Sequence, residues 1–221
     1  MTPPSDVRSR LAFAALDLFD RNGFEATTVD EIAAAVGVNR RTFFRHFPAK
    51  EDAVFFDLPE LLGLLQSALD NGVGDPIPVA GHALAIQLDE LVRRVDLVRR
   101  RAHLVQATPA LADRELIWSG EYQRVLGEHL GRSYTTSRDQ MYARIVAAAL
   151  LAAFGQVVAA WIRDGQEPKS LFAELTDDIT ESMTSTGIRG SGPVAGHPDL
   201  PDAAPATTVP HDDLVLEEHS S

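Results

Sequence analysis

The amino-terminal part of the chain contains three short stretches in which apolar residues recur at helical spacing. In the first stretch they fall at i, i+3, i+4, i+7 and i+8, which predicts one apolar helix face made of Leu11, Ala14, Ala15, Leu18 and Phe19. Asn22 and Gly23 end this stretch, because glycine readily adopts the backbone conformations that close a helix. A first helix followed by a turn is therefore expected.

Two further helices follow, separated by a short glycine turn. Thr28 opens a T-x-x-E capping box, which predicts the start of the second helix. Gly37 ends that helix, and Asn39 is placed to cap a third. In the third helix Phe43 and Phe47 lie one turn apart, and we expect both to face the core.

The remainder of the chain reads as further helices without a strand pattern. A fourth helix over 49–69 contains Pro59, whose ring predicts a kink. After a loop at 71–76, helical patterns cover about 78–95, 97–107, 110–131, 138–163 and 169–185. The predicted fold is all-α, with three parts: a three-helix helix-turn-helix head (1–52), a larger helical ligand-binding and dimerisation domain (53–186), and a disordered acidic tail (187–221).

The third helix concentrates positive charge in an acidic chain. The formal net charge is -12, yet residues 39–50 (NRRTFFRHFPAK) carry four fixed positive charges and no carboxylate. Because the overall acidity repels DNA at long range, such a patch must act within about one Debye length, roughly 10 Å at moderate salt. A basic helix after a glycine turn predicts a helix-turn-helix that enters the major groove of DNA.

Side-chain chemistry suggests a role for each exposed residue of this segment. Arg40 and Arg41 are expected to read guanine edges and Arg45 to hold a phosphate, the alternative being a solvated helix face. Thr42 is suited to base or backbone, and Asn39 begins the DNA-facing turn.

Three more residues are candidates for phosphate contacts. Thr28 and Lys50 stand at predicted helix starts, where free backbone N–H groups favour phosphate, although capping alone explains Thr28 nearly as well. His46 is either a phosphate neighbour, which we favour, or a partly buried residue of the head.

The segment TTVDEIAAAVGVNRRTFFRHFPAKEDAVF resembles the amino-terminal head of the tetracycline-repressor (TetR) family of transcriptional regulators, over roughly residues 8–56. The resemblance implies an all-helical, homodimeric repressor that binds an operator in double-stranded DNA and a small-molecule effector. Two positions depart from the family pattern. Phe44 replaces a common phosphate-binding tyrosine and offers only ring contact to sugar or thymine methyl, and Ala49 replaces a helix cap.

The segments RRRAHLVQATPALADRE and ARIVAAALLAAFGQVVAAWI resemble the family branch associated with acyl-CoA-like ligands. A second arginine cluster, residues 93–101, is either a solvated helix face balanced by carboxylates, the favoured interpretation, or a site for a phosphorylated ligand. Large aromatic side chains often line apolar pockets, although core packing explains any one of them better. The candidate ligand-binding residues are Arg101, His103, Trp118, Tyr122, Phe154 and Trp161.

Other functions find little support. The chain has no cysteine, no i, i+4 pair of histidines, and no G-x-S-x-G, P-loop or G-x-G-x-x-G motif, so we predict no metal, no cofactor and no catalytic residue. The apolar stretch 145–162 is interrupted by Gly155 and Gln156 and is interpreted as a buried helix of a cytoplasmic protein, not a membrane span.

The last two predicted helices, 138–163 and 169–183, are expected to form the homodimer interface, because their small residues permit close approach. The main hypothesis is a repressor released from a palindromic operator by a small apolar or acyl-CoA-like effector. Two rivals remain open at this point: a ligand-free architectural DNA binder, and an enzyme with an incidental helical head.

Overall fold

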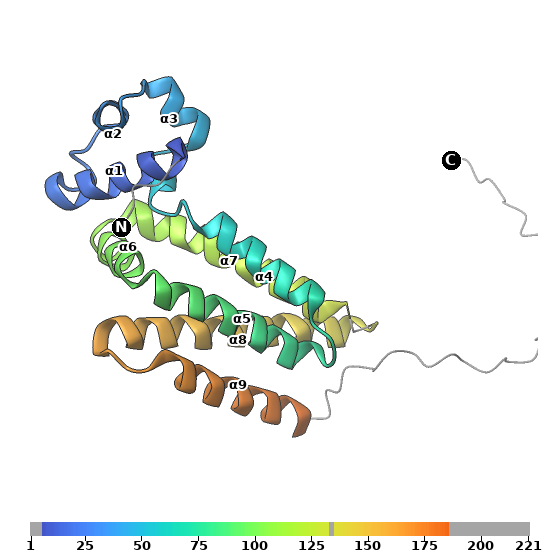
Figure 1. Ribbon diagram of the computed structural model, residues 1–221. Coiled ribbons are helices and arrows are strands. Elements are labelled where there is room, and N and C mark those ends of the chain that lie inside the picture. Colours follow the sequence, from blue (N-terminus) through green and yellow to red (C-terminus); the bar gives the residue numbers. More distant parts are fainter. Residues whose placement is uncertain (1–5, 133–134, 186–221) are drawn as a thin grey trace, which may run out of the picture.

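The computed structural model describes residues 6–132 and 135–185, and these residues form helices without any strand. Three short helices make a head at the top of Figure 1: α1 (Val7–Asn22), α2 (Val29–Val36) and α3 (Arg40–His46). The longer helices form a separate body below the head. The predicted all-α fold with a three-helix head is therefore confirmed. The predicted tail, 187–221, lies outside the described residues.

The helix caps of the head follow the sequence signals. At the start of α2, Glu31 donates its backbone N–H to Thr28 Oγ1 over 3.2 Å, and Thr28 donates its own N–H to the Glu31 carboxylate over 2.8 Å. Gly37 ends the helix with a φ of 75°, in the left-handed region that favours glycine. Asn39 Oδ1 accepts the backbone N–H of Thr42 over 2.9 Å, which caps α3. Both predicted caps are confirmed.

Phe43 and Phe47 are both buried in the core of the head, as their spacing predicts. Their rings lie 5.4 Å apart, and they pack in one apolar cluster with residues of α1 and α2, including Phe19 and Ile32. Because this cluster fixes the inner face of α3, the opposite face of the helix points to solvent.

The predicted fourth helix is wrong in its start and in its kink. A short 3-10 helix, η1 (Glu51–Ala53), takes the place of the predicted start. α4 (Leu58–Asn71) begins after it, with Pro59 in its first turn. A proline there costs no hydrogen bond, because the N–H groups of the first turn have no partner within the helix. The absent cap at Ala49 is also compensated, since its backbone N–H donates to Asp52 Oδ2 over 2.8 Å.

The body contains five further helices, close to the predicted ranges: α5 (Pro76–Arg93), α6 (Val95–Ala107), α7 (Pro109–Gly131), α8 (Ser137–Asp164) and α9 (Pro168–Ser185). α7 packs along α8, and α9 packs against both α8 and α5 (Figure 1). One large apolar cluster, with Leu84, Leu126 and Leu150 at its centre, holds α4, α5, α7, α8 and α9 together.

α8 is less buried than its sequence suggests. Its most apolar stretch has the length and composition of a membrane span, yet only 28% of that stretch is buried in the described structure. Ala147 and Leu150 point into the core, whereas Met141 and Ile145 are 64% and 50% exposed. The interpretation of this stretch as a buried helix therefore holds for one face of α8 only, and the other face is exposed in the described structure.

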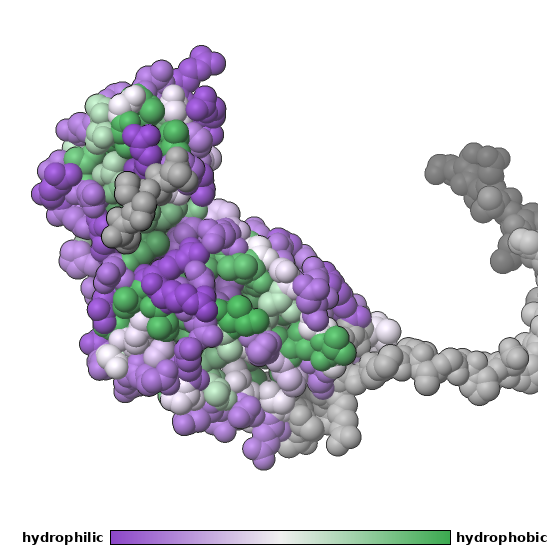
Figure 2. All heavy atoms as spheres, in the orientation of Figure 1, coloured by the Kyte–Doolittle hydropathy of each residue, from purple (hydrophilic) through white to green (hydrophobic). Residues whose placement is uncertain are grey.

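Head and body are joined by packing and by charge. The apolar cluster of the head continues through Ala53–Phe56 and reaches Leu104 and Leu111 of the body, so it crosses the boundary expected at 52/53. Arg100 of α6 donates to Asp17 and Asp20 of α1, each over 2.7 Å. In the space-filling view the molecule narrows at this junction (Figure 2).

Candidate nucleic-acid interface and ligand cavity

The outer face of α3 gathers most of the predicted DNA-binding residues. A shallow hollow of about 500 Å³ is lined by Asn39, Arg41, Thr42, Phe44 and Arg45. Arg41 and Arg45 are exposed, and neither forms an ion pair within the described residues. Their charges are therefore available to a polyanion outside the molecule.

Arg40 is held differently from its neighbours. Its guanidinium pairs with Asp30 of α2 over 2.9 Å and lies 5.2 Å from the centre of the Phe44 ring. Both side chains of the ion pair are more than half exposed, so the pair contributes little stability. It does orient Arg40 along the outer face, and the 42% exposed Phe44 provides the flat surface under it.

Lys50, expected at a phosphate, also has an internal role. Its ammonium donates to the backbone carbonyls of Phe24 and Thr27, over 2.6 and 2.9 Å, and lies 4.1 Å from the centre of the Phe24 ring. Two of its three N–H groups are thus used within the turn between α1 and α2. Lys50 therefore fixes that turn, which leaves one N–H group of its ammonium for a phosphate.

Thr28 and His46 are also constrained by the head. The Thr28 hydroxyl and the Thr28 backbone N–H each donate to the Glu31 carboxylate over 2.8 Å. These two hydrogen bonds lower the pKa of Glu31. His46 Nε2 is buried and has no hydrogen-bond partner in the described part of the chain. This atom does not face solvent, which favours the interpretation of His46 as a partly buried residue.

A cavity of about 400 Å³ in the body brings four of the six predicted ligand residues together: Arg101, Trp118, Tyr122 and Phe154. The rest of its wall is mostly aliphatic and comes from α4 to α8 and the segment before α4. These lining residues include Phe55, Leu58, Leu61, Leu91, Val98, Leu151, Val158 and Ile162. An apolar cavity of this size is near the lower end of the range for small-molecule sites, roughly 300–1,000 Å³.

A few polar groups stand in this apolar wall. Arg101 pairs with Asp57, and the side chains of both are nine-tenths or more buried. Gln87 donates to the Leu61 carbonyl. Burial raises the pKa of the Tyr122 phenol, which therefore stays neutral, and burial also raises the pKa of Glu115 against the attraction of Arg101. Such sparse polar groups orient a ligand whose affinity comes from apolar contact.

The other two predicted ligand residues lie elsewhere. His103 is exposed on the opposite side of α6, where it lines a cleft of about 840 Å³ against the α1–α2 turn. Trp161 is buried beside the cavity in an apolar cluster with Leu61, Leu91 and Val98. A single-helix pattern gives no information on which neighbouring helix a side chain will face, so the sequence does not predict which residues of the set share this cavity.

Three polar residues near the cavity were missed by the sequence reasoning. Gln87 and Glu115 line it, and Asp57 bonds the arginine in its wall. Asp57 had a usable signal, because it is the one charged residue in the apolar run AVFFDLP, and a charge buried in such a run needs a partner. Gln87 and Glu115 stand on otherwise ordinary amphipathic helices.

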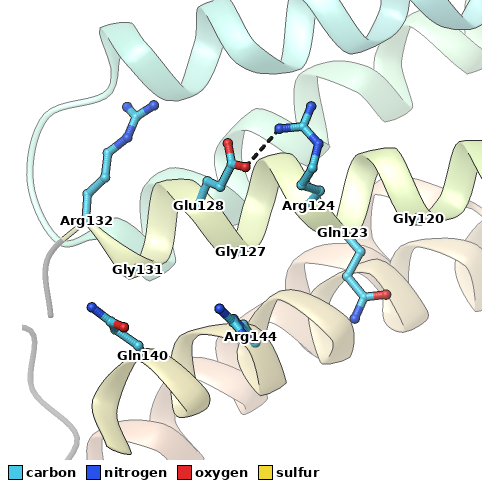
Figure 3. Close-up of a pocket in the computed structure, with 9 residues that line it drawn as sticks. All are labelled: Gly120, Gln123, Arg124, Gly127, Glu128, Gly131, Arg132, Gln140 and Arg144. Carbon is cyan, nitrogen blue, oxygen red and sulfur yellow. Dashed lines mark hydrogen bonds and ion pairs between the residues drawn. The ribbon is translucent and has the colours of Figure 1, made fainter. Parts of the chain in front are cut away.

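A second hollow, between α7 and α8, has a different character. It has a volume of about 690 Å³ and is lined by glycines and polar side chains, with Arg124 paired to Glu128 over 2.9 Å (Figure 3). Gln140 and Arg144 reach toward it from α8 (Figure 3). Its lining contains no aliphatic or aromatic side chain among the described residues, so it lacks the features of a site for an apolar ligand.

The second arginine cluster, residues 93–101, is largely neutralised inside the molecule. Arg93 pairs with Glu90 over 2.5 Å, and Arg94 pairs with Glu60 and Glu90, each over 2.8 Å. With Arg100 and Arg101 also paired, Arg99 alone of the five has no ion pair among the described residues. The favoured interpretation, a helix face balanced by carboxylates, agrees with this arrangement.

Comparison with known proteins relates both the head and the body of the chain to bacterial transcriptional regulators. Residues 13–54 match the model of "Bacterial regulatory proteins, tetR family", and residues 79–186 match the model of the MftR C-terminal domain. The chain is 30% identical to the HTH-type transcriptional regulator TcmR of Streptomyces glaucescens, with 69% of this chain and 71% of TcmR covered.

Two more similarities cover much of the chain. The mycofactocin biosynthesis regulator MftR of Mycobacterium tuberculosis is 27% identical, with 72% of this chain and 82% of MftR covered. Among solved structures, FadR of Thermus thermophilus in complex with lauroyl-CoA superimposes with a TM-score of 0.53 at 23% identity, covering 80% of this chain and 94% of FadR. The chain belongs to the TetR family of bacterial regulatory proteins, whose members are DNA-binding transcriptional regulators and not enzymes.

Proposed function

We propose that the protein is a repressor that binds a palindromic operator as a two-fold dimer and leaves it when a small apolar or acyl-CoA-like effector fills the body cavity. Two observations together carry this proposal. Arg41 and Arg45 on the exposed face of α3 form no ion pair within the described residues, and an apolar cavity has Phe55 and Leu58 in its wall, beside the start of α4. The operator lies in the cytoplasm, where the protein acts.

In the DNA complex, α3 lies in the major groove. Arg41 and the oriented Arg40 are assigned to guanine edges, and Arg45 to phosphate. Phe44 contacts sugar or a thymine methyl group. The two heads of a dimer then reach half-sites about one helical turn apart, roughly 34–36 Å, or a multiple of this.

The exposed face of α8 supports the dimer. Met141, Ile145, Ala152 and Gly155 are exposed at helical spacing, and small residues allow two helices to approach closely. α9 instead exposes acidic residues, among them Asp177 and Asp178, which would repel their copies near a two-fold axis. We therefore place α8 against α8 of the second copy at the centre and α9 at the edge of the interface, and not in a membrane.

An effector would act by population shift, binding best to a conformation whose heads are spaced wrongly for DNA. The route from cavity to head is the segment 51–57, because Ala53–Phe56 belong to the apolar core of the head and Phe55 lines the cavity. Pro59 begins α4 and does not kink it, so the hinge lies before α4. The lauroyl-CoA complex of FadR, a protein of the same fold, supports an acyl ligand.

Selection of bound fragments from genomic DNA by the purified protein, with and without decanoyl-CoA or decanoate, tests this function. We expect one palindromic sequence, recovered without ligand and lost with at least one of the two. Fragments without a common sequence would favour the architectural DNA binder, and absence of any retained DNA would overturn the proposal. Replacement of Ile145 by Glu should dissociate the dimer in sedimentation and abolish selection, whereas Arg163→Glu on an exposed end of α8 serves as the control.

A further inference from the structure

We infer that the effector is an apolar carboxylate, and that its anionic group is bound by Arg101 in exchange for Asp57. This inference rests on the proposed function and specifies its ligand. It has three supports: an arginine in the cavity wall with an unused donor, a carboxylate behind the wall between two arginines, and an apolar lining.

The first support is the state of the Arg101 guanidinium. The Arg101 side chain is only 9% exposed, and it lines the cavity. Its Nη2 donates to Asp57, but its Nε is buried with no hydrogen-bond partner in the described structure. A buried donor left unpaired is costly, and the fork of a guanidinium matches the two oxygens of a carboxylate. A ligand carboxylate would satisfy both donors.

The second support is the position of Asp57. Its Oδ1 accepts from Arg101, while its buried Oδ2 has no hydrogen bond and lies 3.9 Å from Nη1 of Arg94. Arg94 bonds Glu90 through Nε and Glu60 through Nη2, so Nη1 is the group it offers to Asp57. Asp57 can therefore pass from one arginine to the other. The exchange leaves no buried charge without a partner, which is the condition under which a buried ion pair can be opened.

The third support is the remaining chemistry of the cavity. The walls around Arg101 are aliphatic and aromatic, which suits a hydrocarbon body attached to the carboxylate. Glu115 is the carboxyl group that lines the cavity, and burial raises its pKa while the attraction of Arg101 opposes that rise. A cationic ligand would instead meet the Arg101 guanidinium at close range. The charge pattern thus favours an anion.

The exchange would reach the DNA-binding head directly. Asp57 immediately precedes α4, and the four residues before it are buried in the core of the head. Asp52, near the start of the same segment, accepts a hydrogen bond from Arg114 of α7. Movement of Asp57 toward Arg94 therefore shifts a segment that is anchored in the head at one end and in the body at the other.

Calorimetric titration of the full-length protein tests the inference. The probes are hexanoate, decanoate and tetradecanoate, their neutral amides, and decanoyl-CoA. We expect at least one carboxylate to bind about 10- to 100-fold more tightly than its amide, the value of one to two charged hydrogen bonds. Arg99→Gln, at an exposed position on the same helix, is the matched control and should retain the preference.

Two variants separate recognition from folding. Because Arg101→Gln removes the hydrogen bond that Arg101 makes to the buried Asp57, the double variant Asp57→Asn with Arg101→Gln is measured with it. The double variant should lose the preference for carboxylate over amide. Asp57→Asn alone should bind decanoate about tenfold more tightly than the unaltered protein, because the internal competitor has lost its charge.

Equal binding of each carboxylate and its amide, or a preference that survives in the double variant, would overturn the inference. If decanoyl-CoA releases the operator equally in the Arg101 variants and the unaltered protein, the proposed function stands and the carboxylate assignment falls. If decanoate binds through Arg101 but genomic selection recovers no DNA, the ligand assignment stands and the repressor function falls.

Discussion

α3 and α6 each carry a dense cluster of arginines, and the two clusters differ in the partners that surround them. On α3, Arg41 and Arg45 have no ion pair within the described residues. On α6 and the residues that precede it, four of five arginines are paired with carboxylates, several of them far away in sequence. The same local charge therefore serves two purposes. α3 presents it to solvent, while the arginines of the second cluster form ion pairs inside the molecule, and Arg100 joins the body to the head.

This difference shows that a basic cluster is informative only together with its carboxylates. The chain has twelve more acidic than basic residues, yet those near α3 leave its outer face uncovered except at Arg40. Exposed, unpaired charges attract a polyanion at short range. Paired, partly buried charges instead specify how two parts of the molecule fit, because the loss of one partner leaves the other without compensation.

The largest expected effect is on stability and concerns the α6 cluster. Arg101→Met should lower the free energy of unfolding by about 1.5–3 kcal/mol, because Asp57 loses its charged hydrogen bond and keeps only Arg94 as a partner. Asp57→Leu combined with Arg101→Met should recover most of this loss. Urea denaturation measures both. Equal loss in the single and double variants would show that packing and not charge holds this joint.

The next effect concerns DNA affinity and the α3 cluster. Arg41→Ala should weaken operator binding by about 1–3 kcal/mol, as for a bidentate guanine contact, and weaken binding to random DNA much less. Arg40→Ala should likewise relax base preference. Stability should change by no more than about 0.5 kcal/mol, since the Arg41 side chain is exposed. An equal loss on operator and random DNA would remove these residues from base reading.

A substitution of Lys50 tests whether its charge binds DNA, like the arginines of α3, or is bonded inside the molecule. Sequence places it with the α3 cluster, but its ammonium bonds two backbone carbonyls. Lys50→Ala should therefore lower stability by roughly 1–3 kcal/mol. Lys169→Ala, which removes an exposed ion pair with Asp89, is the control and should cost less than about 1 kcal/mol. Unchanged stability in Lys50→Ala, with a flatter salt dependence of DNA binding, would return it to the phosphate role.

The smallest effect concerns the cap of α2, which supports α3. Thr28→Ala should cost about 1 kcal/mol in thermal or urea unfolding. Hydrogen bonds from Thr28 lower the pKa of Glu31, so the contribution of this carboxylate is complete above its ordinary pKa and is lost as pH falls through the lowered one. The stability difference between the unaltered protein and Glu31→Gln should narrow with falling pH. A difference that widens would contradict the cap assignment.

Short-range features of the fold were predictable from sequence. Thr28, Gly37 and Asn39 act within three residues of themselves, and the spacing of Phe43 and Phe47 defines one helix face. The kink predicted at Pro59 was wrong, because a proline kinks a helix only from its interior and is compatible with its first turn. Pro59 lies in the first turn because the residues before it pack into the head and are not part of α4.

Features that depend on distant partners were not predictable in the same way. The partners of Arg100 on α1 lie 80 or more positions earlier, and Asp57 lies 44 positions from Arg101. Trp118 and Phe154 could be chosen for the cavity by residue type, but Trp161 could not be separated from them, because its placement depends on how α8 is rotated against its neighbours.

The salt dependence of operator binding tests the contrast between the two clusters most directly. Affinity is measured over a series of salt concentrations for Arg45→Ala and for Arg99→Ala, each an exposed arginine without an ion pair in the described residues. We predict that Arg45→Ala reduces the slope of log affinity against log salt by roughly 0.9 for each phosphate that the variant no longer neutralises, and that Arg99→Ala leaves the slope unchanged. Equal slopes for the two variants would contradict the assignment of DNA binding to α3.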